Sequence, residues 1–409
     1  MTTHDHGAPR RPLHPETLAV RTQAPRSDAR EHSVPLYLTS SFVFDDAEQA
    51  RALFADEVPG NIYSRYSNPN ADEFVEKLCL LEGAEEGVAT ASGMAAVFAT
   101  LGALLSAGDH VVAARALFGS THQLLTRVLP RWGIASTYVD ATAGVEAWAA
   151  ALRPTTKLVF VETPSNPGLE VIDLAALGAL CRSRGVVLAV DNCFCTPALQ
   201  RPIDFGADLV VHSATKFIDG QGRALGGAVV GPRSLVADVR YFTRHTGPSI
   251  SPFNAWLLSK SLETLALRME RHSSNALRVA GALERHPGVE RVRYPFLAGH
   301  PQHDLARRQM RDGGGVLTLV VRGGIDGARR FVDALRLVSH SPNLGDTRTI
   351  ATHPASTTHS KLTEEERLAV GIAPGLVRIS VGLEHPDDVS DDLTQALDVA
   401  AGAPALAAR

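Results

Sequence analysis

Short apolar runs alternate with helical stretches between about residue 70 and residue 235. The runs are rich in valine and bounded by turn residues: Val111–Ala114, Leu158–Val161, Val186–Val190 and Leu209–Val211. The helical stretches lie between them, at Glu73–Leu81, Met94–Leu105, Ser120–Arg131, Val145–Ala151 and Leu174–Arg184. Such an alternation is typical of a mostly parallel sheet covered by helices on both faces. The pattern therefore predicts an α/β fold.

The pattern differs on either side of this region. Before about residue 60 there is little periodicity, which predicts an arm rather than a domain. After Pro252 a long helical stretch runs from Asn254 to about Arg285 and ends at a Pro-Gly stop signal. The rest combines strands at Val316–Val321 and Val377–Val381 with helices at Ile325–Leu335 and Asp387–Ala400. We therefore expect an arm over residues 1–65, a large domain over 66–255 and a smaller C-terminal α+β domain over 256–409.

The composition is that of an ordinary globular protein, with 44% hydrophobic and 21% charged residues. The formal net charge of −4 argues against nucleic acid or an anionic membrane as a partner, because both call for a basic patch. Residues 87–108 carry no charge, but they are alanine-rich and interrupted by polar residues. This favours a buried strand, turn and helix over a membrane span. The N-terminus lacks the apolar segment of a signal peptide.

Four cysteines occur, Cys79, Cys181, Cys193 and Cys195, and none forms a C-x-x-C pair. A disulfide framework or a structural zinc site is therefore not expected. The sequence predicts a cytoplasmic protein without a metal.

Chemically active side chains follow the predicted strands. Asp191 comes directly after Val186–Val190, and His212-Ser213-Ala214-Thr215-Lys216 follows Leu209–Val211. Glu162-Thr163-Pro164-Ser165-Asn166-Pro167 follows Leu158–Val161, and Ser92-Gly93-Met94 opens a helix after a short run ending at Thr90. Because ligands gather at the carboxyl ends of the strands in such sheets, we expect an acid, a lysine, hydroxyls and a helix N-terminus at one edge.

This set suits pyridoxal phosphate (PLP). A lysine amine forms a Schiff base with an aldehyde, a carboxylate keeps a pyridine nitrogen protonated, and a helix N-terminus binds phosphate. Each residue alone also has an ordinary explanation: Asp191 as a helix cap, Lys216 as a solvated lysine, and Ser213 and Thr215 as turn caps. Their combination is what favours a site.

Two other motifs overlap this region. Ser213-Ala214-Thr215-Lys216 matches the S-x-x-K of serine acyl-transfer enzymes, but the S-D-N and K-T-G companions are missing. The segment from Gly220 to Gly226 is one residue too long for a dinucleotide loop, and a strand at Ala228–Val230 follows it instead of a helix.

The chain resembles the Cys/Met-metabolism PLP-dependent enzymes of fold type I, from about Tyr37 to Asp392. The segments that carry the resemblance include Tyr63-Ser-Arg65-Tyr-Ser-Asn-Pro, Ala91-Ser-Gly-Met94, Glu162-Thr-Pro-Ser-Asn-Pro167, Val190-Asp191-Asn192, Ser213-Ala-Thr-Lys216, His353-Pro-Ala-Ser356 and Val377-Arg378-Ile-Ser-Val-Gly382. Within the family the chain is most similar to the O-succinylhomoserine sulfhydrylases, through Leu117-Phe-Gly-Ser120, Asp219–Gly227, Arg244–Pro248 and Ser341–Asp346.

The resemblance implies a role for each matching residue. Lys216 would bind the PLP aldehyde and then move protons, Asp191 would face the pyridine nitrogen, and Asn166 the ring oxygen. Phosphate would be held by Ser92, Gly93, Met94, Ser213 and Thr215, with Tyr63 and Arg65 reaching the phosphate of a neighbouring subunit. Arg378 would bind the substrate α-carboxylate, assisted by the backbone of Asn343. A homotetramer built from two dimers is implied as well.

Phe118 departs from many relatives, notably the γ-lyases and cystathionine γ-synthases, which carry a tyrosine that stacks on PLP and takes part in proton transfer. Phenylalanine can stack, but it cannot donate a hydrogen bond or a proton. This favours a sulfhydrylase of methionine biosynthesis that converts O-succinylhomoserine and sulfide to homocysteine and succinate. The open alternatives are a cystathionine γ-synthase, an O-acetylhomoserine sulfhydrylase and a methionine or cystathionine γ-lyase. A serine acyl-transfer enzyme using Ser213 and Lys216 is the alternative outside PLP chemistry.

Overall fold

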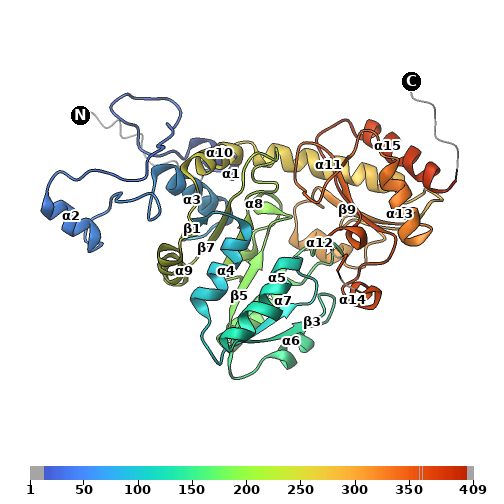
Figure 1. Ribbon diagram of the computed structural model, residues 1–409, viewed down its shortest axis with the longest axis horizontal. Helices are drawn as coiled ribbons and strands as arrows, with labels where there is room; N and C mark the ends of the chain where they lie inside the picture. The colour runs from blue at the N-terminus through green and yellow to red at the C-terminus, as the bar shows by residue number, and fades with distance from the viewer. Residues whose placement is uncertain (1–12, 359, 362, 403–409) are drawn as a thin grey trace.

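The computed structural model describes residues 13–402 except 359 and 362, and it contains two β-sheets (Figure 1). The larger sheet has seven strands in the order β1-β7-β6-β5-β4-β2-β3. Their bounds are β1 Glu86–Thr90, β2 His110–Ala114, β3 Ala135–Val139, β4 Thr156–Glu162, β5 Val187–Asp191, β6 Leu209–Ser213 and β7 Gly227–Gly231. All neighbouring pairs are parallel except those that involve β7. The predicted α/β fold is confirmed.

The central strands are buried along almost their whole length. Val111, Val159 and Val210 are each fully inaccessible, as expected for strands covered on both faces. The helices of this region are α3 Pro69–Glu82, α4 Gly93–Leu104, α6 Val145–Ala151, α7 Leu174–Arg184, α8 Thr196–Leu199 and α9 Arg233–Thr246. The sequence gives α7 clear end signals, an Asp173 N-cap that accepts from Ala176 and a left-handed Gly185 after the last turn.

Two predicted helices are less regular in the structure. Residues 120–131 do not form one α-helix: α5 Gly119–Gln123 continues as a π-helical turn at Leu124–Val128 and a 3-10 turn at Leu129–Trp132. Pro130 explains the change, because proline cannot donate within a helix. The long stretch from Asn254 to about Arg285 is two helices, α10 Pro252–Leu262 and α11 Leu265–Leu283, and not one.

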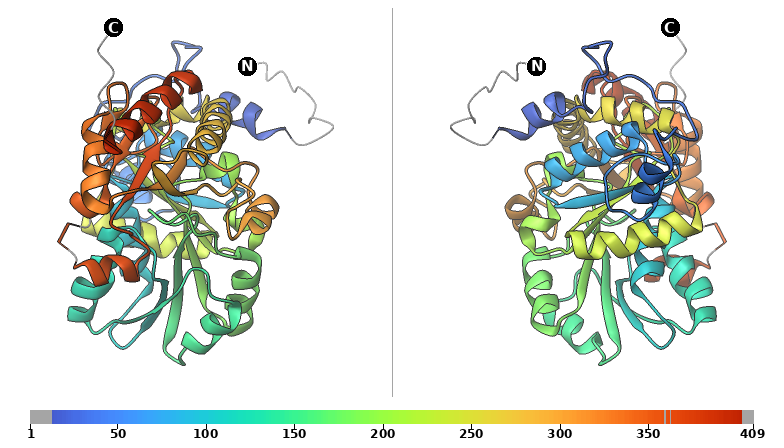
Figure 2. Two further views of the ribbon diagram at one scale, coloured as in Figure 1. Left: turned by 90° about the vertical axis from the view of Figure 1, so that its right-hand side faces the viewer. Right: turned by 90° about the vertical axis from the view of Figure 1, so that its left-hand side faces the viewer.

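The C-terminal part gathers at one end of the molecule, coloured orange to red in Figures 1 and 2. Its sheet has five strands in the order β10-β11-β12-β9-β8, where two were predicted. The strands are β8 Val289–Arg293, β9 Val316–Val321, β10 Ser339–His340, β11 Ile350–Thr352 and β12 Leu376–Ser380, and the helices are α12 His303–Gln309, α13 Gly324–Asp333, α14 Glu364–Ala369 and α15 Pro386–Ala400. The predicted strands are the central pair β9 and β12. The three that were not predicted are short or lie at an edge, where the hydrophobic pattern is weak.

The N-terminal segment lies mostly outside the two sheets. It contains α1 Pro15–Arg21 and α2 Ala47–Phe54, and α2 stands away from the rest of the chain at the left of Figure 1. Backbone N–H groups tie its first half to α3: that of Ala24 donates to Glu73 Oε2 and that of Tyr37 to Asn70 Oδ1, both at 2.8 Å. Beyond these ties, Leu38 and Val43 are 71% and 97% exposed. In the described part of the chain, no helix is long and apolar enough to cross a membrane.

Candidate active site

The carboxyl ends of three adjacent parallel strands carry the predicted site. β4 ends at Glu162, β5 ends at Asp191, and β6 ends at Ser213. Glu162 and Asp191 are register partners, so their side chains lie next to each other on the same face. The sequence prediction that these residues share one edge of the sheet agrees with this topology.

A tightly packed turn lies beside this edge, where β1 leads into α4. Ser92 caps α4 and accepts the N–H of Ala95 at 3.1 Å. A Cβ atom on Gly93 would lie 2.5 Å from Ser213 Cβ, and one on Gly227 would lie 2.2 Å from the Ser92 carbonyl. Only glycines therefore let the start of α4 approach the ends of β6 and β7 so closely. The result is a helix N-terminus surrounded by hydroxyls, a good site for an anion.

Lys216 lies in the turn that follows β6. Its Nζ donates to Asn343 Oδ1 at 2.5 Å. The Thr215 hydroxyl stabilises the turn, because it donates to the carbonyl of Gly226 and accepts the N–H of the same residue. Burial lowers the pKa of Lys216, and the nearby charge of Arg378 lowers it further, although Cys193 acts in the opposite direction. The amine therefore loses its proton more readily than an ordinary lysine, as attack on a carbonyl requires.

Arg378 on β12 joins the second sheet to this edge. It is 5% exposed, and its guanidinium donates to Asn166 Oδ1 at 3.0 Å and to the carbonyls of Pro342 and Asn343 at 2.9 and 3.1 Å. Burial lowers its pKa to about 10, so it stays charged at neutral pH. Lys216, Asn343, Arg378 and Asn166 thus form one connected chain of hydrogen bonds.

Asp191 is the acid that the sequence predicts for this site. Its Oδ1 accepts the backbone N–H of Cys193 at 3.0 Å. Burial raises its pKa to about 6, opposed by that amide and by the charge of His212. The neighbouring Glu162 Oε2 accepts the backbone N–H of Phe118 at 2.8 Å.

Phe118 and Met94 lie on neighbouring elements. Phe118 is the N-cap of α5 and is 41% exposed, so its ring is not a core aromatic. Thr121 of the same helix donates to the sulfur of Met94 at 3.7 Å, which links the start of α4 to α5.

The structure places Tyr63 and Arg65 in different surroundings. Arg65 donates to the carbonyl of Arg244 and lies over the rings of Tyr66 and Tyr63, at 4.8 and 5.4 Å from their centroids. In this chain Arg65 therefore contacts α9, and Tyr63 lies beside Arg65 and Tyr66.

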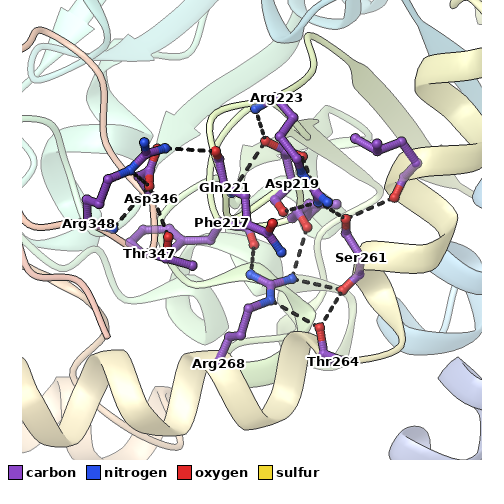
Figure 3. Close-up of polar contacts among 12 residues, drawn as sticks. Phe217, Asp219, Gln221, Arg223, Ser261, Thr264, Arg268, Asp346, Thr347 and Arg348 are labelled. Carbon is purple, nitrogen blue, oxygen red and sulfur yellow. Dashed lines mark hydrogen bonds and ion pairs between the residues drawn. The ribbon is translucent and has the colours of Figure 1, made fainter. Parts of the chain in front are cut away.

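The turn that carries Lys216 is anchored from behind by α11 (Figure 3). Arg268 is 8% exposed and donates to the carbonyls of Phe217, Ile218 and Ser261. Its bond to Ser261 also supplies a partner at the break between α10 and α11. On the far side of the same turn, Arg348 donates to the carbonyl of Gln221 at 3.1 Å.

These residues fit pyridoxal phosphate. The glycine-lined start of α4 with Ser92, Ser213 and Thr215 provides for a phosphate, Lys216 for an aldehyde, and Asp191 for a ring nitrogen. The tight approach at Gly93 and Gly227 is the structural observation that supports this fit, because a side chain at either position would push the start of α4 away from Ser213 and the strand ends.

Sequence reasoning gave no role to two residues at this edge. In the sequence, Glu162 stands out only as part of a motif, and Cys193 only as one of four cysteines. Both lie within two residues of predicted site residues or strand ends, and position at the carboxyl end of a buried strand was the signal that could have found Glu162.

Comparison with known proteins agrees with this fit. The family model of the Cys/Met metabolism PLP-dependent enzymes matches residues 16–398. The chain is 52% identical to an O-succinylhomoserine sulfhydrylase of Pseudomonas aeruginosa, with 93% of this chain and 94% of that protein covered. It is 44% identical to an L-methionine gamma-lyase of Porphyromonas gingivalis, with 90% and 92% covered. A crystal structure from Campylobacter jejuni, assigned as an O-acetylhomoserine (thiol)-lyase and containing a pyridoxyl-lysine monophosphate, has a TM-score of 0.91 at 35% identity and covers 94% of this chain and 100% of that one.

The anchoring of the Lys216 turn predicts an asymmetric effect of two arginine substitutions. Arg268→Leu removes the donor to the buried carbonyls of Phe217 and Ile218 and should lower the free energy of unfolding of the cofactor-free protein by about 3 kcal/mol. The matched control is Arg348→Leu, whose side chain is 66% exposed and whose loss should cost clearly less. Urea denaturation measures both. Equal losses would contradict the anchoring role.

Proposed function

The chain belongs to the Cys/Met metabolism PLP-dependent enzymes, and we propose that it is an O-succinylhomoserine sulfhydrylase. It would convert O-succinylhomoserine and hydrogen sulfide to homocysteine and succinate. The observation that carries this proposal is the hydrogen-bonded chain from Lys216 through Asn343 to Arg378, beside the acid Asp191. Relatives of that name at 52% and 48% identity, from Pseudomonas aeruginosa and Mycobacterium tuberculosis, support it.

Bound PLP would supply an electron sink that stabilises negative charge at the substrate carbon next to the amine. Lys216 would hold the cofactor aldehyde, Asp191 the ring nitrogen and Asn166 the ring oxygen. Ser92, Gly93, Met94, Ser213 and Thr215 would hold the phosphate.

The substrate would be oriented by Arg378. Its guanidinium is held by an amide oxygen and two carbonyls. No carboxylate within the described part of the chain forms an ion pair with it, so its charge would be available to the substrate α-carboxylate. This would place the Cα proton near Lys216, whose depressed pKa suits it to accept that proton as the free amine. Lys216 would also carry away a Cβ proton, succinate would depart from Cγ as an anion, and hydrosulfide would add at the same carbon. Lys216 would return protons to Cα and Cβ.

A second candidate is γ-elimination, in which water rather than sulfide completes the reaction and 2-oxobutanoate forms. The identity of 44% to an L-methionine gamma-lyase favours keeping it. Phe118 argues against it, because a phenylalanine ring cannot transfer a proton.

We further propose a homotetramer of two dimers in which the arm serves a neighbouring copy. The protruding α2 and the exposed Leu38 and Val43 support this, because apolar side chains on an extended arm are typical of an interface. Tyr63 and Arg65 would then reach the phosphate of the neighbour. The four cysteines are all free, which supports a place in the reducing cytoplasm.

The first experiment is a product analysis by mass spectrometry. The PLP-loaded protein receives O-succinylhomoserine with equal amounts of sulfide and cysteine, and homocysteine should be the main product. Cystathionine instead would transfer the assignment to a γ-synthase, and product from O-acetylhomoserine alone would change the acyl group. As a control, Lys216→Ala should lose the cofactor's colour and at least about a thousandfold in turnover. A Lys216→Ala protein that still turns over would contradict the mechanism.

The role of Phe118 is separable from the identity of the enzyme. Phe118→Tyr restores a phenol that can transfer protons, so the rate of 2-oxobutanoate formation should rise about tenfold. Phe118→Leu, which removes the ring without adding a hydroxyl, is the control and should not raise it. If elimination by the tyrosine variant stays at the wild-type rate, Phe118 does not set the type of reaction.

Mixing two inactive variants tests the arm. If Arg65 serves the neighbouring subunit, Lys216→Ala and Arg65→Ala chains that are unfolded and refolded together form mixed dimers with one intact site. About a quarter of wild-type activity should then return. Each variant refolded alone is the control. Failure to recover activity in verified mixed oligomers would mean that Arg65 acts within its own chain.

A further inference from the structure

Glu162 is a buried acid to which the proposed mechanism gives no task. It is 4% exposed, and its Oε2 accepts the N–H of Phe118 at 2.8 Å. It forms no ion pair with any residue in the ranges 13–358, 360–361 and 363–402. A buried carboxyl group without a counterion is costly as an anion, so its environment must either neutralise it or keep it protonated.

The neighbouring acid determines which of these occurs. Glu162 and Asp191 are register partners on adjacent strands, which are about 4.8 Å apart in a sheet. Two carboxylates this close do not both ionise readily. Burial and the charge of Asp191 raise the pKa of Glu162 well above its ordinary value, opposed by the amides of Phe118 and Asn166 and by Arg378. Asp191 is raised only to about 6.

The other groups that face the pair do not take up the proton. The Cys193 thiol follows Asp191, and burial raises its pKa well above its usual range, so it stays neutral. Arg378 faces the pair, but its hydrogen bonds go to Asn166, Pro342 and Asn343. The charge of His212 lowers the pKa of Asp191, which also favours the proton on Glu162. The proton of the pair therefore belongs on Glu162.

We propose that Glu162 is a positioning residue: as the neutral acid beside Asp191, it holds the backbone of Phe118 at the site and leaves the negative charge of the pair on Asp191. The inference rests on the proposed function, which assigns Asp191 to the ring nitrogen of PLP, and on the stacking of Phe118 on PLP that the family resemblance implies. The inference also explains why an acid stands at the end of β4. Through its bond to Phe118, this acid connects the start of α5 to the sheet next to the charge of Asp191.

Glu162→Gln tests the protonation state. Glutamine keeps an oxygen that can accept from Phe118 and cannot ionise, so it imitates the neutral acid. The pH midpoint of the visible absorption band of bound PLP should stay within about 0.3 unit of the wild-type value. Asp191→Asn is the control that must move this midpoint. A shift of about one unit or more in the glutamine variant would overturn the proposal, because it would mean that a charge had been removed.

Glu162→Leu tests the link to Phe118. Leucine offers no acceptor, so the loop should loosen and PLP should dissociate about tenfold faster, measured by the loss of visible circular dichroism on dilution. In a Phe118→Leu background the same change should add less than about twofold, because the ring it positions is already gone. Equal acceleration in both backgrounds would overturn the link, as would an unchanged rate in the single variant.

The two proposals fail in different ways. A wild-type protein that binds no PLP would overturn the proposed function, and this inference with it. A wild-type protein that binds PLP and forms homocysteine, while its Glu162 variants depart from the results above, would overturn the inference alone.

Discussion

Polar chemistry in this molecule depends on one geometric constraint, the parallel arrangement of β4, β5 and β6. The interior of the sheet is covered on both faces, so a charged side chain within it would be costly. At the carboxyl edge the strands end together, and Glu162, Asp191 and Ser213 become neighbours although 51 positions separate the first from the last. The same constraint brings the start of α4 to this edge, because β1 runs parallel to β6 with β7 between them.

The second sheet contributes what this edge lacks, a buried guanidinium group and a firm support for the lysine. Arg378 projects from β12 toward Asn166, and the loop after Pro342 bonds both Arg378 and Lys216. Arg268 on α11 holds the backbone directly after Lys216 (Figure 3). Because the lysine is bonded at its tip and its turn is bonded from behind, the relative position of the two sheets determines the geometry of the amine.

The parts of this arrangement that could be predicted are those with a clear local sequence pattern. The valine-rich runs predicted β2, β4, β5 and β6, and the residues directly after them predicted Asp191 and Lys216. Sequence reasoning missed short strands such as β11, which are defined by their partners rather than by their own composition. It also missed the break between α10 and α11, where Arg268 donates to the Ser261 carbonyl, because helical periodicity does not reveal such a contact. The sequence pattern gives no role to Glu162. The role proposed for it depends on its bond to Phe118 and its place beside Asp191, which are 44 and 29 positions away in the sequence.

The proposed function accounts for the charges at the site: Arg378 and Asp191, which form no ion pair with another described residue, are the two charges to which it assigns a ligand. Arg378 is solvated by an amide and two carbonyls, which stabilise its charge without cancelling it. A carboxylate in the same place would compete with the α-carboxylate of an amino-acid substrate. The same logic explains why a second ionised acid beside Asp191 would be harmful: it would attract Arg378 and strengthen the hold on any ring proton. A protonated Glu162 keeps the fold's connection to Phe118 while leaving one negative and one positive charge for the ligands.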